Sequence, residues 1–256
     1  MSGLEGIRGV LFDVDGTLMN ADHAIPGAAR VLAGLRARGL PFRLTTNISR
    51  RPRAATAAIL RREGIAVEDR EVLVPAVLAR RLILESATPR AAFLLPPEAR
   101  ADFDGVTDDE NRPAWVVVGD LGAQFTWERL NRAFGWLQNG ARLLALHRNR
   151  FWDNGRDGIV LDAGPFVAAL EYAAGTRAEL VGKPSPGFFA LALADLGLQP
   201  SEALVVGDDL EADCAGAHAA GCRAALVLTG KTRRDDLTGA RRPPDLIWES
   251  VADFPA

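Results

Sequence analysis

Cysteine is scarce in this chain, which has only Cys214 and Cys222 among its 256 residues. Both lie among small apolar residues and no export signal is evident, so we expect reduced core residues rather than a disulfide. The scarcity therefore argues against a fold held together by disulfides. A cytoplasmic protein is the expectation that follows.

Long hydrophobic runs and a surplus of positive charge are also missing. The longest apolar stretches, at residues 114–119 and 203–207, fall far short of the roughly 20 residues that a membrane span needs. A count of 30 Lys and Arg against 33 Asp and Glu leaves a net charge of -3. No basic excess is present to neutralise a nucleic-acid backbone or an anionic membrane. We therefore expect neither nucleic acid nor membrane as a partner.

The order of apolar and amphipathic segments predicts an α/β fold. Short runs rich in Val, Leu, Ile and Phe alternate with amphipathic stretches, as in βαβ units around a parallel sheet. In the first part of the chain we expect strands at 7–12 and 42–45 and helices at 26–38 and 52–62. From about residue 180 the pattern resumes, with helices at 186–196 and 210–220 and strands at 203–206 and 224–228.

The middle of the chain has a different texture, with many prolines and an acidic stretch at residues 102–110. Its shorter elements predict a second α/β unit, with strands at 91–95, 115–118 and 143–146 and helices at 127–137 and 165–173. A compact insertion between two halves of one sheet explains this order most simply.

The strongest chemical signal is the segment Phe12-Asp13-Val14-Asp15-Gly16-Thr17-Leu18, directly after an apolar strand. Carboxylates at the carboxyl end of a parallel strand project into the crevice where open α/β sheets bind ligands. Side chains two residues apart on a strand face the same side, so Asp13 and Asp15 can converge on one cation and one phosphate. The alternative is a surface turn in which an aspartate caps the following segment.

Two carboxylates this close repel each other unless a cation is present, and Mg²⁺ prefers oxygen ligands and also contacts phosphate. The pair therefore predicts a bound Mg²⁺. One carboxylate can attack phosphorus and form an aspartyl-phosphate, while the other protonates the leaving oxygen and later activates water.

A second acidic segment, at residues 205–213, follows another apolar strand late in the chain. Asp208 stands at the end of that strand and supplies a third carboxylate, which can complete an octahedral oxygen site with the first pair. Asp209 and Asp213 are possible supporting residues around the metal ligands. For these two the alternative is that Asp209 caps the next helix and Asp213 lies on a solvated face.

Two further segments carry groups that suit a phosphoryl ligand. Lys183 stands in a turn rich in Gly and Pro, where its ammonium can hold a nucleophilic carboxylate and a phosphate close together. Thr46 and Asn47 follow the second strand, where a hydroxyl and an amide or backbone N–H can donate to phosphoryl oxygens. The alternatives are a solvated lysine and an ordinary Thr-Asn turn.

In order and character these four segments resemble the four motifs of the haloacid dehalogenase superfamily. The resemblance implies a Rossmann-like three-layer core with a parallel sheet, and Asp13 as nucleophile and Mg²⁺ ligand. It implies Asp15 as general acid and base that also binds the metal through its carbonyl group, and Asp208 as a further metal ligand. Thr46 is then a phosphate binder and Lys183 the lysine of the third motif.

The chain is similar to one subgroup, the NagD-like subfamily IIA, nearly end to end. Residues 125–134, 162–173 and 181–186 carry this similarity, which implies a large α/β cap domain. The expected domains are a catalytic core at 1–75 and 181–256 and a cap at 76–180. The resemblance implies that the cap lies over the site, shapes substrate choice and forms homodimers.

Substrate choice is expected to depend on the cap, where His147, Arg148 and Arg150 are candidate contacts. The alternative is a basic loop that faces solvent. Asp15 favours ordinary ester hydrolysis, because a leaving alkoxide needs a proton.

The predicted function is Mg²⁺-dependent hydrolysis of a small phosphorylated metabolite through an aspartyl-phosphate. Two alternatives stay open: a phosphomutase, and a protein that binds or senses phosphate with negligible turnover. Isomerised sugar phosphate without free phosphate would indicate the mutase, and binding without turnover would indicate the sensor.

Overall fold

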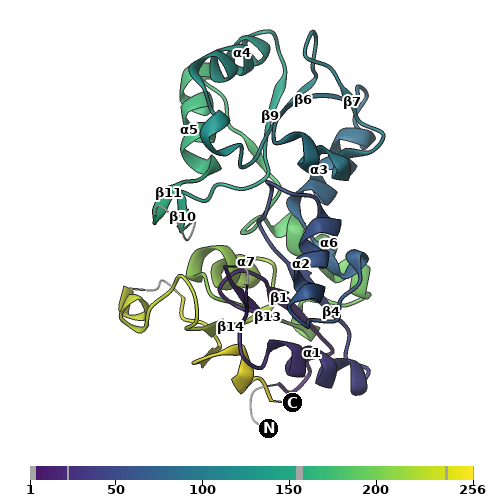
Figure 1. Ribbon diagram of the computed structural model, residues 1–256, viewed down its shortest axis with the longest axis vertical. Helices are drawn as coiled ribbons and strands as arrows, with labels where there is room; N and C mark the ends of the chain where they lie inside the picture. Colours follow the sequence, from purple (N-terminus) through teal and green to yellow (C-terminus); the bar gives the residue numbers. More distant parts are fainter. Residues whose placement is uncertain (1–3, 22, 154–157, 240–241, 256) are drawn as a thin grey trace. The chain divides into compact units, whose positions relative to one another are not determined.

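Two separate sheets of parallel strands organise the chain, and each belongs to a unit of its own (Figure 1). The computed structural model describes residues 4–21, 23–153, 158–239 and 242–255. The first unit is formed by Met1–Thr46, Arg53–Leu73 and Lys183–Ala256, and the second by Asn47–Pro52 and Val74–Gly182. The middle of the chain therefore folds apart from the two ends, together with the short segment 47–52.

The strands of the first sheet run in the order β15-β14-β13-β1-β4-β5, and all neighbours are parallel. Every residue of the central strand β1 is buried, as expected where both faces of a parallel sheet are covered. This burial explains why its sequence is a continuous apolar run rather than an alternating one. The strands are β1 (Gly9–Asp13), β4 (Phe42–Thr45), β5 (Val72–Leu73), β13 (Ala203–Gly207), β14 (Arg223–Val227) and β15 (Leu246–Trp248).

Helices of the first unit begin and end at residues suited to those positions. Helix α6, Pro186–Leu196, has a proline in its first turn, where no backbone N–H is needed, and ends at Gly197 with a φ of 66°. The helix expected at 210–220 is π-helical over Leu210–Ala215 and continues as α7 (Gly216–Ala219). The other elements are α1 (Ala28–Ala37), α2 (Arg53–Arg62), β2 (Met19–Asn20) and β3 (His23–Ala24).

The second sheet has the strand order β12-β9-β8-β6-β7, again with parallel neighbours. Helices α4 and α5 lie together on one face of it (Figure 1), in an apolar cluster that includes Val116, Ala133, Leu143 and Val167. Within the described ranges, no helix has the length and apolar character needed to cross a membrane. The elements are β6 (Arg90–Leu94), β7 (Thr107–Asp108), β8 (Trp115–Val118), α4 (Trp127–Gln138), β9 (Arg142–Ala145), β10 (Phe151–Asp153), β11 (Ile159–Leu161), α5 (Ala163–Ala174) and β12 (Glu179–Leu180).

Helix α3, Pro75–Glu85, is the main element that the sequence pattern does not predict. It buries Ala76, Ala79 and Ile83, whose spacing is helical. A Val-Pro pair precedes this run, and such a pair usually marks the end of an element because proline disfavours helix in the residue before it. Here Pro75 occupies the first helical position instead, where it is well tolerated.

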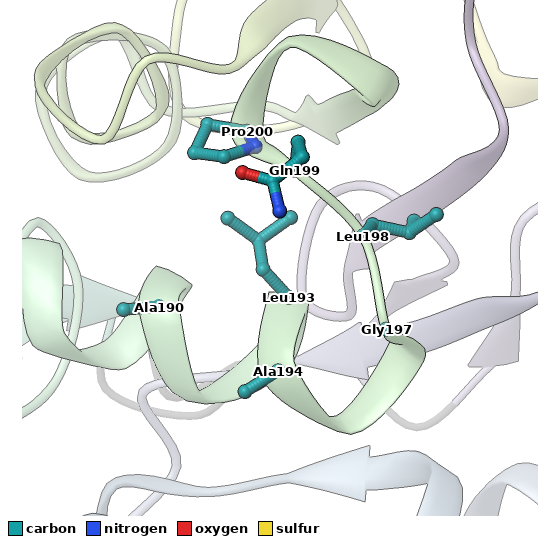
Figure 2. A pocket seen from close by; sticks show the side chains of 7 residues that line it. All are labelled: Ala190, Leu193, Ala194, Gly197, Leu198, Gln199 and Pro200. Carbon is teal, nitrogen blue, oxygen red and sulfur yellow. The ribbon is translucent and has the colours of Figure 1, made fainter.

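An open groove of about 440 Å³ lies beside the carboxyl end of α6 in the first unit (Figure 2). Leu193 points from the helix toward Gln199 and Pro200, and the lining contains no charged side chain. None of the acidic residues singled out from the sequence lines it. The groove is therefore no candidate for phosphoryl chemistry.

Candidate active site

The ends of three neighbouring strands bring the predicted residues to one edge of the first sheet. Asp13 is the last residue of β1 and pairs in register with Thr45, the last residue of β4. Asp208 directly follows β13, which neighbours β1 on the other side. Because parallel strands end at the same edge of the sheet, segments about 200 residues apart in sequence meet there. In open α/β sheets, ligands bind at this edge.

Asp13, Asp208 and Asp213 form a buried cluster in which one oxygen of each carboxylate lies within 4.8 Å of the others. The three residues are 5%, 7% and 1% exposed. Asp213 reaches the cluster because Gly207 leaves room for it: a Cβ on Gly207 would lie 2.2 Å from the Asp213 carboxyl carbon. Asp213 therefore does not lie on a solvated face.

Lys183 is the cation that the chain itself supplies to this cluster. Its ammonium donates to Asp13 Oδ1 at 2.5 Å, to Asp213 Oδ1 at 2.6 Å and to the Thr45 carbonyl oxygen at 3.3 Å. Burial by itself would lower the pKa of Lys183, but the two carboxylates outweigh it and raise that pKa above its usual value. The lysine consequently keeps its charge at neutral pH.

The cluster holds more negative charge than Lys183 balances. Burial and the neighbouring carboxylates raise the pKa of Asp13, raise that of Asp208 well above its usual value, and raise that of Asp213 to about 7. When all three carboxylates are ionised, the cluster together with the Lys183 ammonium has a net charge of −2, which one divalent cation would neutralise. The raised pKa values follow from the same repulsion. Asp13 Oδ2 is buried without a hydrogen-bond partner among the described residues. This all-oxygen donor set fits a hard divalent cation such as Mg²⁺.

Asp208 is held by a turn that the sequence analysis does not single out. The backbone N–H of Lys231 donates to Asp208 Oδ2 at 2.6 Å. A Cβ on Gly16 or on Gly230 would lie 2.3 or 2.0 Å from that same oxygen. The turn follows β14, the strand next to β13. A Thr-Gly pair directly after an apolar strand is the sequence signal that could have identified it.

Asp209 serves the backbone rather than the acidic cluster. Its Oδ1 accepts from the N–H groups of Glu211 at 2.8 Å and Ala212 at 3.1 Å, which caps the start of the helical segment. Its Oδ2 accepts from the Lys231 ammonium at 2.5 Å. Burial opposes ionisation, but Lys231 and these hydrogen bonds lower the pKa of Asp209 below its usual value. Asp209 therefore caps the following helical segment, which is the alternative given for it in the sequence analysis.

Of the remaining predicted residues, the structure brings Asp15 and Thr46 together. Asp15 is exposed and accepts from Thr46 Oγ1 at 3.3 Å, whereas Thr46 is buried directly after β4. Asn47, the next residue, belongs to the second unit, where its amide donates to Asn149 Oδ1 at 3.4 Å. The two neighbours Thr46 and Asn47 are therefore divided between the units.

Two of the residues expected to contact substrate form hydrogen bonds or ion pairs with other residues of the second unit. His147 is 1% exposed, and its Nε2 lies 2.8 Å from Ser49 Oγ and 3.7 Å from Asp162 Oδ1. Arg148 donates through both terminal nitrogens to Glu171, at 3.0 and 2.6 Å. The alternative of a solvent-facing residue is wrong for His147, because its side chain is buried in a polar network. Its contact with substrate stays a prediction.

Comparison with known proteins assigns the chain to a family. A family model described as haloacid dehalogenase-like hydrolase matches residues 10–106, and a HAD-hydrolase-like model matches residues 180–254. Phospholysine phosphohistidine inorganic pyrophosphate phosphatase from Bos taurus is 39% identical over 239 residues, which cover 91% of this chain and 87% of that protein. The chain belongs to the haloacid dehalogenase-like hydrolase family.

Two further similarities extend over nearly the whole of this haloacid dehalogenase-like hydrolase. Human haloacid dehalogenase-like hydrolase domain-containing protein 2 is 38% identical over 251 residues, covering 98% of this chain and 95% of that protein. The structure of 4-nitrophenylphosphatase from Thermotoga maritima matches with a TM-score of 0.91 at 30% identity, covering 97% of this chain and 96% of that chain. The predicted family, the α/β fold with parallel sheets and the hydrolase class are confirmed.

Proposed function

We propose that this hydrolase is a Mg²⁺-dependent phosphatase that releases phosphate from a small phosphorylated metabolite. The observation that carries the proposal is the buried cluster of Asp13, Asp208 and Asp213, in which three carboxylates share the Lys183 ammonium. The bovine relative and the Thermotoga maritima protein are both named phosphatases, which supports the reaction class. The charge of the cluster supports the cofactor.

The groups proposed to hold Mg²⁺ are the carboxylates of Asp13 and Asp208 and the main-chain carbonyl of Asp15. Asp213 supports them, because both its oxygens are engaged, Oδ1 by Lys183 and Oδ2 by the Asp209 N–H at 3.2 Å. When bound, Mg²⁺ supplies positive charge that offsets the repulsion between an attacking carboxylate and the phosphoryl oxygens.

Asp13 is the proposed nucleophile. Lys183 holds its Oδ1, while Oδ2 has no hydrogen-bond partner in the described part of the chain. A carboxylate oxygen attacks phosphorus, the bond from phosphorus to the leaving oxygen breaks, and an aspartyl-phosphate forms. The permanent charge of Lys183 keeps two anions close together while this happens.

Asp15 is the proposed general acid and base, and it is exposed, unlike Asp13. Its protonated form gives a proton to the leaving alkoxide. The resulting carboxylate then removes a proton from the water that attacks the aspartyl-phosphate, which regenerates Asp13 and releases phosphate. The Thr46 hydroxyl at 3.3 Å orients the Asp15 carboxylate. Thr46 and Asn47 stay the proposed binders of the phosphoryl group.

A phosphoric ester is the proposed substrate class. Ester cleavage yields an alkoxide that requires a proton, and Asp15 is a group that can supply one. The Thermotoga maritima protein is named for an ester substrate, whereas the bovine relative is named for phospholysine, phosphohistidine and pyrophosphate. A panel that contains both kinds of phosphate therefore distinguishes the ester from the nitrogen-linked substrate.

The test is phosphate release by the purified protein, with and without Mg²⁺, from sugar phosphates, nucleotides, pyridoxal phosphate, pyrophosphate and phospho-amino acids. Asp13→Asn should lower kcat/KM by about 10⁴-fold or more, because an amide is a poor nucleophile toward phosphorus. Asp235→Asn, an exposed acid of the same unit, is the matched control and should keep wild-type activity.

Wild-type release by Asp13→Asn would contradict the proposal. Isomerised sugar phosphate in place of free phosphate would favour the mutase. Binding of phosphates by calorimetry without turnover on any of them would favour the sensor.

The remaining expectations need separate measurements. A core at 1–75 and 181–256 and a substrate-selecting cap at 76–180 are proposed, and exchange of the cap with that of a relative should transfer substrate preference. A homodimer formed through the cap should be visible as twice the monomer mass in light scattering. A cytoplasmic location is checked by fractionation of cells that express the protein.

A further inference from the structure

The turn at residues 229–232 holds Asp208 at two points. The N–H of Lys231 donates to Asp208 Oδ2 at 2.6 Å, and the N–H of Thr232 donates to the Asp208 carbonyl oxygen at 3.1 Å. One bond fixes the carboxylate and the other fixes the main chain that carries it. Asp208 is 7% exposed, so a backbone donor to its carboxylate is a strong, charge-assisted partner.

The same turn is tied to the segment that follows β1. Thr229 Oγ1 donates to the Gly16 carbonyl oxygen at 2.5 Å. Gly16 and Gly230 lie against the Asp208 carboxylate from two chain segments, since a Cβ on either would lie 2.3 or 2.0 Å from Oδ2. A side chain at position 230 would therefore displace the carboxylate.

We propose that the 229–232 turn is a positioning element that sets the affinity for Mg²⁺ by fixing the orientation of Asp208. The inference rests on the proposed function only in requiring Mg²⁺ at the acidic cluster. With Oδ2 held by the turn, the other oxygen of Asp208 has a fixed direction. Loss of the hold lets the side chain rotate, and groups that orient a metal ligand typically contribute about 10- to 100-fold to metal affinity.

The backbone and the side chain of Lys231 have separate roles in this account. The backbone N–H holds Asp208, whereas the ammonium is 47% exposed and is bonded to Asp209. Removal of the Lys231 ammonium takes away a positive charge near the proposed Mg²⁺ site, and this change in charge does not weaken the binding of a cation. Lys231→Ala keeps the N–H and should therefore not raise the dissociation constant for Mg²⁺.

The experiment is calorimetric titration of Mg²⁺ into the metal-free full chain. Gly230→Ala should raise the dissociation constant about tenfold or more, because the methyl group moves the carboxylate. The φ of Gly230 lies outside the left-handed region, so alanine is not strained there by the backbone itself. Gly135→Ala in α4, where a Cβ would meet nothing within 4 Å, is the matched control with an unchanged constant.

A second readout separates positioning from general damage. In an assay of phosphate release, Gly230→Ala should raise the Mg²⁺ concentration for half-maximal rate, while kcat at saturating Mg²⁺ largely recovers. Loss of folding alone would lower the rate at every Mg²⁺ concentration. If Gly230→Ala does not fold, Thr229→Val, which removes only the hydroxyl bond to Gly16, should raise the dissociation constant by about threefold.

Wild-type Mg²⁺ affinity in a folded Gly230→Ala, or in Thr229→Val where the former does not fold, would overturn the inference. So would a loss of affinity in Lys231→Ala as large as that in Gly230→Ala. Absence of Mg²⁺ binding by the wild-type protein is a different result, because it would overturn the proposed cofactor and not the role of the turn alone.

Discussion

Both parallel sheets of this hydrolase carry polar side chains beyond the carboxyl ends of their strands, but the two sets differ in charge balance. In the first unit, three buried carboxylates share the single ammonium of Lys183. In the second, the buried carboxylates of Asp120 and Asp162 have separate partners: Asp120 lies 3.4 Å from Arg50 Nε, and Asp162 lies 3.7 Å from His147 Nε2. Strand topology therefore indicates where a site can form, and the clustering of three carboxylates around one ammonium is the feature that favours a cation in the first unit.

The largest effect is expected from removal of the Lys183 ammonium, the positive side chain of the acidic cluster in the first unit. Lys183→Met leaves buried carboxylates without a counter-charge, and it should lower the free energy of unfolding of the Mg²⁺-free protein by about 3–5 kcal/mol. Urea denaturation at pH 8 measures this. Lys231→Met is the control, because its pair with Asp209 is half exposed and should contribute no more than about 1 kcal/mol. Equal losses in the two variants would contradict the contrast.

A smaller effect is expected in the polar network of the second unit. Asp162 caps α5 by accepting from the Ala163 N–H at 2.7 Å. Asp162→Ala should lower the free energy of unfolding by about 0.5–2 kcal/mol, as removal of a helix cap does. Asp162→Asn keeps an acceptor and should lose less. Both variants should bind Mg²⁺ as the wild type does, and weaker binding in either would contradict a purely structural role for this network.

The third effect concerns pH. Burial lowers the pKa of His147, against the opposing influence of Asp162 and Asp120. In the unfolded chain the pKa of His147 is about 6.5, so below that pH the unfolded chain binds more protons than the folded one. The contribution of neutral, buried His147 to stability is therefore present above that pH and is lost as the pH falls. His147→Gln should remove it. The difference in free energy of unfolding between wild type and variant should shrink from pH 8 to pH 5, by up to about 1.4 kcal/mol per pH unit.

The control for this pH effect is Gln138→Ala, because it replaces an exposed residue and removes no titratable group. Its stability difference from the wild type should not depend on pH. A pH-independent difference for His147→Gln as well would contradict the assignment of the acid sensitivity to His147.

The sequence predicts four of the six strands of the first sheet, β1, β4, β13 and β14, because each is a short apolar run of four or five residues, whereas the shorter β5 and β15 are missed. β4 has the predicted bounds 42–45, and β1 and β13 differ from prediction by one or two residues at their ends. Helix α3 is missed because the rule for residues before proline competes with the helical spacing of its apolar residues. β10 and β11 are also missed, since strands of three residues carry little periodic signal.

The sequence predicts the parts of the candidate site that consist of charged side chains, and it does not predict the parts in which a backbone N–H donates a hydrogen bond. Asp13, Lys183 and Asp208 stand out by residue type at strand ends and turns, and the structure brings them together. The Lys231 N–H leaves no trace in residue type, because every residue except proline has one. The burial of His147 depends on Ser49, almost 100 residues away, and one sequence does not reveal that pairing.

The most direct test of this account is calorimetric titration of Mg²⁺ into the wild-type protein and into Asp208→Asn. We predict one Mg²⁺ per chain for the wild type. We also predict loss of that binding in Asp208→Asn, with an unchanged or higher free energy of unfolding in the absence of metal, because one repelling carboxylate is gone. A wild-type protein that binds no Mg²⁺, or an Asp208→Asn variant that binds it equally well, would contradict the claim that the acidic cluster of the first unit holds the catalytic cation.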